Sequence, residues 1–270
     1  MKTALTIAGS DCSGGAGIQA DLKTMTMNGV FAMSAITALT AQNTTGVTGI
    51  LEVSPEFLGQ QLDAVFTDIR PDAVKIGMVS SSPLIEKIAE RLRFYQAENI
   101  VLDPVMAATS GSRLIAEEAV ETLKKELIPL ASLVTPNIPE AEELSGLRIT
   151  DAASMEEAAY WFLDQGASAV VLKGGHAEFR KGVDLFLDRE GGRLLSGNVY
   201  AFPDVHGSGC CFASAVAAYI ALGHPVFSAV EQAKVFIDGA MRYAVEYAPG
   251  RFTMNPNWRE HQEYPVLLER

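Results

Sequence analysis

The sequence predicts an α/β fold with a mostly parallel central sheet, helices on both of its faces and a small antiparallel strand pair. Short β-rich apolar runs alternate with helical segments along most of the chain, and most of these runs end in glycine or polar residues. Parallel strands need helical crossovers of this kind. No linker, composition break or internal repeat divides the chain, so we expect one domain over residues 1–270.

Six segments have the composition of buried strands, because they are short, apolar and rich in β-branched residues. The predicted strands cover residues 5–8, 34–41, 73–78, 100–102, 132–134 and 169–172. Two later segments, 183–187 and 198–201, flank the turn-forming residues 189–192 and are predicted to pair in antiparallel fashion. The tail from 248 to 270 contains proline, asparagine and charge without a clear period, so we predict irregular structure there.

Helices are predicted where an apolar face lies between start and stop signals. Ser54-Pro55 and Ser82-Pro83 each combine a cap residue with a proline at the first helical position. The predicted helices cover residues 18–27, 55–67, 83–96, 116–127, 155–165, 212–222 and 226–245. The 212–222 segment contains no charge and much alanine, so we expect a buried helix there.

The formal net charge is −12, from 21 Lys and Arg against 33 Asp and Glu. This argues against nucleic acid and anionic membranes as partners, because both are bound by an excess of basic residues. Since no uninterrupted apolar run reaches membrane-spanning length and residues 1–8 are too short for a signal peptide, we expect neither feature. Three cysteines, two of them adjacent, indicate free thiols in a reducing cytoplasm, and their spacing does not suggest zinc.

Residues 205–211 (Val-His-Gly-Ser-Gly-Cys-Cys) lead directly into the predicted 212–222 helix. Backbone N–H groups at a helix start have no partner inside the helix, and the helix dipole favours negative charge there. Gly207 and Gly209 allow the backbone to approach a ligand closely. We therefore predict an anion site beside the Cys210 thiol. The alternative is a tight turn with a cysteine that only packs.

In a parallel sheet, ligands bind beyond the carboxyl ends of the strands. The residues predicted at those ends are Gln42, Gly77, Met78, Asp103, Asn137, Glu140 and Lys173. Carboxylate and amide oxygens suit a hydrated Mg²⁺ ion, and a lysine suits a phosphate. The set therefore indicates phosphoryl transfer from a magnesium nucleotide.

Each of these residues also has a structural alternative. Asp103 and Asn137 adjoin prolines and can be turn formers. Glu140 can cap its own short helix, and Lys173 can extend from a strand end into solvent.

Two common nucleotide-binding patterns do not fit. Gly15, Gly17 and Ala20 match the spacing of the dinucleotide fingerprint, but no acidic residue lies between Asp21 and Glu52 to bind a ribose. The sequence Gly-x-x-x-x-Gly-Lys-Ser/Thr of P-loop enzymes is absent from the chain.

The ordered motifs resemble the hydroxymethylpyrimidine/phosphomethylpyrimidine kinases, which are vitamin kinases of the ribokinase-like fold. The resemblance covers roughly residues 3 to 245. The matching segments are Ala8–Asp11, Ser13–Thr24, Ala41–Thr44, Lys75–Met78, Asp103–Met106, Thr135–Asn137, Lys173–His176 and His206–Cys210. The resemblance implies a cytoplasmic, homodimeric enzyme of thiamine biosynthesis that uses ATP and Mg²⁺. Its implied reaction phosphorylates 4-amino-5-hydroxymethyl-2-methylpyrimidine and then the monophosphate.

The resemblance also implies site residues. Gln42 resembles the residue that pairs with the aminopyrimidine, and the other implied substrate-binding positions are Gly9, Asp21 and Met78. The implied nucleotide-binding positions are Asn137, Lys173 and Ser208, and the implied metal-binding positions are Asp103 and Glu140. The implied catalytic positions are the anion-hole residues Gly207 and Gly209, together with Lys173 and Cys210. Sugar kinases of the same fold carry aspartate at the last of these positions.

Cys210 also has a chemical rationale. The first acceptor is an alcohol that loses its proton as it attacks, so a base helps, and a thiol at a helix start is expected to have a lowered pKa. The second acceptor is an ionised phosphate and needs no base.

The chain departs from its relatives at Val205, Ser208 and Cys211, and at Thr109, where many relatives have lysine. Their glycine-rich C-terminal ending is also absent. The departures leave the efficiency of the second step open. A pyridoxal/pyridoxine kinase and a non-catalytic pyrimidine-binding protein remain alternatives.

Overall fold

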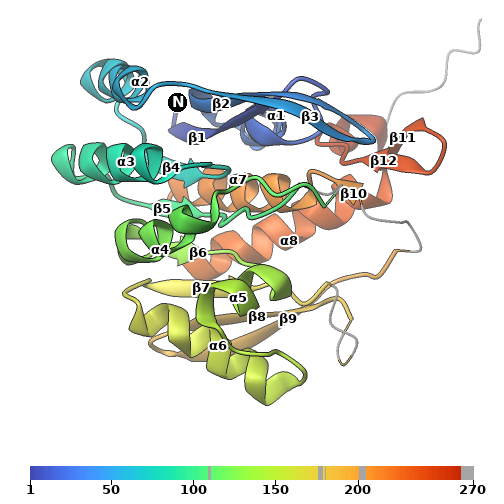
Figure 1. Ribbon diagram of the computed structural model, residues 1–270. Coiled ribbons are helices and arrows are strands. Elements are labelled where there is room, and N and C mark those ends of the chain that lie inside the picture. Colours follow the sequence, from blue (N-terminus) through green and yellow to red (C-terminus); the bar gives the residue numbers. More distant parts are fainter. Residues whose placement is uncertain (109–110, 176–178, 180, 201–204, 263–270) are drawn as a thin grey trace, which may run out of the picture.

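The computed structural model describes residues 1–108, 111–175, 179, 181–200 and 205–262. A nine-stranded sheet runs through the molecule (Figure 1). Its strands lie in the order β3 (Gly46–Glu52), β2 (Phe31–Asn43), β1 (Thr3–Asp11), β4 (Ala73–Ile76), β5 (Ile100–Leu102), β6 (Leu133–Val134), β7 (Ala169–Leu172), β8 (Val183–Asp188) and β9 (Gly191–Ser196). Strands β2, β1, β4, β5, β6 and β7 are parallel, whereas β3, β8 and β9 pair antiparallel at the two edges.

Helices cover both faces of this sheet, as predicted (Figure 1). One face packs against α2 (Pro55–Asp68), α3 (Ser82–Phe94), α4 (Glu117–Glu126), α5 (Ile138–Ser145) and α6 (Ala152–Asp164). The other face packs against α1 (Gly17–Met27), α7 (Ser208–Ala221) and α8 (Val226–Arg242). None of the helices in the described ranges is long and apolar enough to cross a membrane.

The central strands contribute side chains to a hydrophobic core on each face of the sheet, because successive side chains along a strand point to opposite faces. In β7, Val170 and Leu172 join the core under α2–α6, whereas Ala169 and Val171 join the core under α7 and α8. Both faces of the central strands are buried, which explains their continuous apolar runs.

Helix α7 is buried along almost its whole length, and its alanines let it pack closely against α1 and α8. It begins at Ser208, four residues before the apolar run that predicted it. Gly207 precedes the helix with a φ of 84°, a left-handed conformation that favours glycine. Gly209 and Cys210 therefore belong to the first turn of the helix.

The antiparallel pair differs from the prediction. The partner of β8 is β9 (Gly191–Ser196), not residues 198–201. Asp188 Oδ1 accepts hydrogen bonds from the amides of Glu190 and Gly191, so the turn is tight and the return strand starts at once. Residues 197–200 instead contact α8, where Tyr200 donates to Asp238, and Ala201 lies outside the described residues.

The tail is more ordered than predicted. A three-stranded sheet forms from β10 (Val205–His206), β12 (Arg251–Thr253) and β11 (Val245–Ala248), and a 3₁₀ helix, η2 (Trp258–Gln262), follows. Helix α8 ends at Arg242, before the predicted 245, because β11 begins there. The β10–β12 pairing brings the tail against the segment that starts α7.

The strand order also locates the site. The first parallel strand, β1, has β2 on one side and β4 on the other, so the chain reverses its direction of growth at β1. In open α/β sheets, ligands bind beyond the carboxyl ends of the strands at such a switch point.

Candidate active site

Lys173 and Asp103 form an ion pair at the carboxyl ends of β7 and β5. Lys173 Nζ lies 3.2 Å from Asp103 Oδ1, and Thr135, which follows β6, donates to the same oxygen at 3.2 Å. A Cβ atom on Gly209 would lie 3.4 Å from Lys173 Nζ and 3.7 Å from Asp103 Oδ2. The structure thus brings the first turn of α7 against an ion pair from the ends of β5 and β7, the strands on either side of β6.

Gly207 and the glycine-rich loop after β1 meet through their backbones. A Cβ atom on Gly207 would collide with the carbonyl oxygen of Gly15, so both the φ of Gly207 and the space around it require glycine. The N–H groups of a first helical turn are not bonded within the helix. The positive end of α7 therefore lies beside Lys173, an arrangement that attracts phosphate.

Asn137 and Glu140 form a capping box at the start of α5. Asn137 Oδ1 accepts from the amide of Glu140 at 2.8 Å, and Glu140 Oε2 accepts from the amide of Asn137 at 2.8 Å. One oxygen of Glu140 therefore caps its own helix, as the structural alternative predicts. Burial raises the pKa of Glu140 to about 7, while Lys173 opposes the shift and Asp103 adds to it.

Asp21 and Lys75 form a second ion pair, and neither side chain has exposed surface. Lys75 Nζ lies 2.9 Å from Asp21 Oδ2, and Thr6 and Ser214 also donate to the Asp21 carboxylate. Burial would lower the pKa of Lys75, but the Asp21 carboxylate holds it above its usual range. Asp21 was predicted to contact substrate. Its buried carboxylate instead accepts hydrogen bonds from Lys75, Thr6 and Ser214. Any effect of Asp21 on a ligand would therefore act through the position or charge of these three side chains.

Lys75 is a polar residue that the sequence-based site prediction missed. The available signal was a lysine in the middle of the apolar strand β4. Gly77 follows this strand, and a Cβ atom there would lie 2.5 Å from Lys75 Nζ. Glycine at the exit of β4 thus leaves space for the buried ammonium group.

Cys210 interacts electrostatically with both ion pairs. The charges of Lys75, Asp21 and Asp103 act on its thiol, and the amide of Gly17 at the start of α1 donates to it. Burial nevertheless raises the pKa of Cys210 to about 11. The expected lowering at a helix start is therefore wrong, because desolvation of the thiolate outweighs the helix end and the nearby lysine. The neighbouring Cys211 is buried and packs in the core.

Gly9, Met78 and Gln42 lie around the carboxyl ends of β1, β4 and β2. A Cβ atom on Gly9 would lie 2.8 Å from Met78 Sδ, and Met78 packs against Ala38 and Leu114. The Gln42 side-chain amide lies 3.5 Å from Nε2 of His206, the residue before Gly207. This contact connects the rim around Gln42 to the start of α7.

Thr109 and His176, named above from the sequence, lie outside the described residues.

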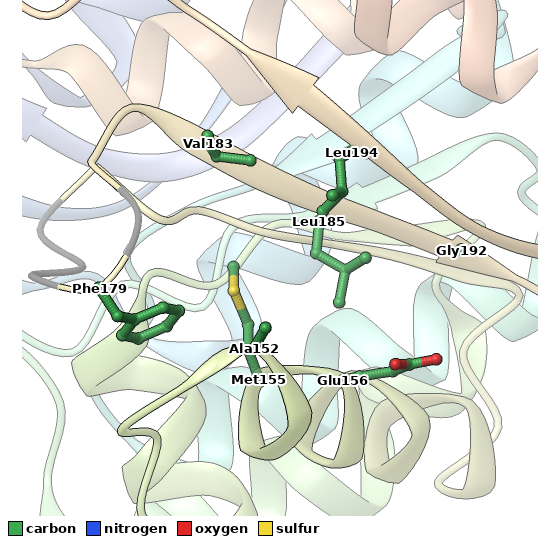
Figure 2. Close-up of a pocket in the computed structure, with 8 residues that line it drawn as sticks. All are labelled: Ala152, Met155, Glu156, Phe179, Val183, Leu185, Gly192 and Leu194. Atoms are coloured by element: carbon green, nitrogen blue, oxygen red, sulfur yellow. The ribbon is translucent and has the colours of Figure 1, made fainter.

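A cavity of about 220 Å³ lies between α6, β8 and β9, away from the predicted site. Figure 2 shows its largely apolar lining, in which Glu156 is the charged residue. None of the predicted site residues lines this cavity.

Comparison with known proteins identifies the family. The family model described as phosphomethylpyrimidine kinase matches residues 11–255. The chain belongs to the phosphomethylpyrimidine kinase family. This confirms the resemblance inferred from the motifs, and it agrees with the ribokinase-like architecture of the sheet.

Several curated kinases of this family are close relatives. The chain is 47% identical to the hydroxymethylpyrimidine/phosphomethylpyrimidine kinase of Rhizobium meliloti, and the match covers 92% of this chain and 94% of that protein. The chain is also 50% identical to the thiamine biosynthesis bifunctional protein ThiED of Geobacter sulfurreducens, and this match covers 93% of the present chain. The match spans about half (51%) of that longer protein.

Solved structures of related vitamin kinases have the same fold. The phosphomethylpyrimidine kinase of Clostridium difficile 630 superposes with a TM-score of 0.81 at 44% identity, covering 89% of this chain and 100% of that one. The pyridoxal kinase of Staphylococcus aureus in complex with AMP-PCP and pyridoxal superposes with a TM-score of 0.89 at 33% identity, covering 97% and 96%. Fold similarity alone therefore does not separate the pyrimidine kinases from the pyridoxal kinases.

Proposed function

We propose that this kinase transfers phosphate from ATP to 4-amino-5-hydroxymethyl-2-methylpyrimidine and then to the resulting monophosphate, in thiamine biosynthesis. The observation that supports this most directly is the Lys173–Asp103 pair facing Gly209 at the start of α7. Positive groups held in place around a migrating phosphoryl group supply most of the catalysis in such reactions. The names of the relatives at 47% identity and above support the pyrimidine substrate and the pathway.

Each site residue has a proposed role. Lys173 binds phosphate oxygens, and the backbone of Gly207 and Gly209 stabilises the charge on the transferred group. Asn137 and Ser208 contact the nucleotide. Gln42 binds the aminopyrimidine edge, while the remaining pocket positions are Gly9, Met78 and, through its buried contacts, Asp21.

Cys210 is proposed to accept the proton of the attacking alcohol. With a pKa of about 11, the thiol is protonated at neutral pH, so the small thiolate fraction limits the first step. The second acceptor is a phosphate already ionised at neutral pH, so this limit does not apply to it.

Asp103 and Glu140 are proposed to bind Mg²⁺, and their surroundings fit that role. Both side chains are buried, and each interacts electrostatically with the other beside Lys173. Among the described residues, no group of three or more His, Cys, Asp or Glu could hold a metal. Asp103 and Glu140 would hold a Mg²⁺ ion, and the ion would supply positive charge to the nucleotide phosphates during transfer.

The Mg²⁺ requirement is expected to depend on pH. Since the pKa of Glu140 is raised to about 7, a proton competes with Mg²⁺ for this carboxylate at lower pH and leaves it at higher pH. At limiting Mg²⁺, the rate of the second phosphorylation, which does not use the Cys210 base, is expected to rise severalfold between about pH 6 and about pH 8. Saturating Mg²⁺ is expected to flatten this profile, and Glu140→Gln to remove it. An apparent Mg²⁺ affinity of the wild type that stays constant with pH would contradict the role of Glu140.

The substrate is tested by measuring ADP release with each candidate acceptor. We expect release with the hydroxymethylpyrimidine and with its monophosphate, and a lower kcat/KM with pyridoxine and pyridoxal. A preference for the pyridines would instead support the pyridoxal kinase alternative, which the 0.89 TM-score to a pyridoxal kinase keeps open. Binding of the pyrimidine without ADP release would indicate a non-catalytic protein.

We also propose a cytoplasmic homodimer, with the β2–β3 hairpin as its contact surface. Leu39 and Leu51 are cross-strand neighbours that are 46% and 66% exposed, and β3 is an edge strand (Figure 1). Exposed apolar side chains on a sheet edge typically mark a protein contact. Wild-type protein is expected to sediment as a dimer and Leu51→Glu as a monomer. A monomeric wild type at micromolar concentration would rule out this surface.

A further inference from the structure

Three polar side chains meet at the rim of the site, from β1, β2 and β10. His206 Nε2 lies 2.9 Å from Asp11 Oδ2, and the two residues are 195 positions apart in the sequence. The same nitrogen lies 3.5 Å from the side-chain amide of Gln42. His206 and Asp11 are largely buried, with 14% and 3% of their side chains exposed.

Asp11 determines where His206 carries its proton. Burial alone would raise the pKa of Asp11, but hydrogen bonds from His206, from Ser13 and from the amide of Ala16 lower it to about 2. Asp11 is therefore a carboxylate, which only accepts hydrogen bonds. A histidine nitrogen facing it at 2.9 Å must carry a proton, whether the ring is neutral or charged.

This proton constrains the Gln42 amide. With the amide nitrogen toward His206, two donors face each other at 3.5 Å, and Thr40 Oγ1 has to donate its single proton both to Gln42 (3.1 Å) and to the carbonyl oxygen of Ser10 (2.9 Å). Turning the amide by 180° removes both conflicts. The amide nitrogen then donates to Thr40, whose proton goes to Ser10. The amide oxygen faces the protonated Nε2 of His206, which gives its single proton mainly to Asp11 at 2.9 Å and shares it with Gln42 at 3.5 Å.

We propose that Asp11, acting through His206, selects this orientation of the Gln42 amide and thereby sets the specificity of the substrate pocket. The inference rests on the proposed function, in which Gln42 binds the substrate ring. The selected amide offers a carbonyl oxygen on the His206 side and an N–H on the Thr40 side. A ring nitrogen with an adjacent amino group complements this pair in one orientation, whereas pyridoxine has no amino group to donate to the oxygen.

His206, Asp11 and Thr40 are thus positioning residues, and steady-state kinetics can test them. His206→Leu removes the donor, His206→Gln places an N–H within similar reach, and Thr40→Val removes the second partner of the amide. Cys12→Ala is the matched control, because Cys12 is exposed and its sulfur hydrogen-bonds to the backbone of Gln42, not to the side-chain amide. For each variant, kcat and the KM values for ATP, the hydroxymethylpyrimidine and pyridoxine are measured.

His206→Leu is expected to raise the KM for the hydroxymethylpyrimidine about tenfold, the usual effect of losing one oriented hydrogen bond. The KM for ATP is expected to stay near the wild-type value, and the preference for the pyrimidine over pyridoxine is expected to fall. His206→Gln is expected to restore most of both losses. Thr40→Val is expected to shift the pyrimidine KM in the same direction, and Cys12→Ala to match the wild type.

Two results would overturn the inference while leaving the proposed function intact. One is an unchanged pyrimidine KM in His206→Leu or, if that variant does not fold, in Thr40→Val. The other is an equal fall in kcat alone for His206→Leu and His206→Gln, which would indicate a disturbance of the adjacent Gly207. A wild type that releases no ADP with the pyrimidine would instead refute the proposed function, and this inference with it.

Discussion

Replacing Cys210 by alanine is expected to slow phosphorylation of the hydroxymethylpyrimidine by about 100-fold or more, the lower end of what a general base contributes. Phosphorylation of the monophosphate is expected to fall by less than about fivefold, because its acceptor oxygen is already ionised. The thiol interacts electrostatically with the Asp21–Lys75 and Asp103–Lys173 pairs and accepts a hydrogen bond from the amide of Gly17. Separate steady-state assays of the two steps measure the ratio of the losses.

The pH dependence gives an independent measure of the same role. Because burial raises the pKa of Cys210 to about 11, the thiolate fraction grows roughly tenfold per pH unit throughout the neutral range. The wild-type rate of the first step is therefore expected to rise with pH, and this rise is expected to be lost in Cys210→Ala. Cys211→Ala is the control, since this buried neighbour packs in the core. Equal losses in both steps would show that Cys210 only shapes the pocket.

Replacing Lys173 by methionine is expected to slow both steps by about 10²–10³-fold, the usual loss when one group that stabilises transition-state charge is removed. Burial would lower the pKa of Lys173, but Asp103 and Glu140 hold it above its usual range, so the side chain is a permanent cation. The charge lies beside the positive end of α7, where the phosphoryl group is proposed to pass. Both acceptors receive phosphate from the same donor, so the loss should not discriminate between them.

Two controls separate this effect from damage to the fold. Lys181→Met removes an exposed lysine from the segment after β7 and is expected to leave both rates unchanged. The double variant Lys173→Met/Asp103→Asn removes both charges of the ion pair. The remaining buried carboxyl, Glu140, can stay protonated because burial raises its pKa to about 7, so this variant should unfold at a temperature near that of the wild type. Wild-type rates in a folded Lys173→Met variant would remove Lys173 from the mechanism.

Much of the framework could be predicted from local patterns. The apolar periods placed the parallel strands and their helices, because a strand buried on both faces and a helix with one apolar face have different repeats. The positions Asp103 and Lys173 could be predicted to meet, since parallel strands deliver their carboxyl ends to one edge. The β9 strand could not be located in the same way. Its start depends on a turn in which the Asp188 side chain accepts hydrogen bonds from the amides of Glu190 and Gly191.

The prediction of a lowered pKa for the Cys210 thiol failed for a related reason. A thiol at a helix start has a lowered pKa when solvent remains nearby, and the local sequence around Cys210 indicated only the helix start. In the structure, residues of α1 and β4 lie around this partly buried thiol, and the cost of desolvating a thiolate exceeds the benefit of the helix end. Burial is contributed by segments far from Cys210 in the sequence.

The alternation of the parallel strands with helices, the family and the identity of the strand-end residues follow from the chain itself, because each depends on neighbouring residues and on their spacing. Strands β3, β11 and β12 were not predicted. The contacts that determine proton positions and pKa values at the site form only in the folded molecule. Asp11 meets His206 across 195 positions, and Asp21 meets Ser214 across 193. Proton positions, amide orientation and pKa values depend on such distances and on exclusion of water, and both arise only when the sheet and α7 pack together.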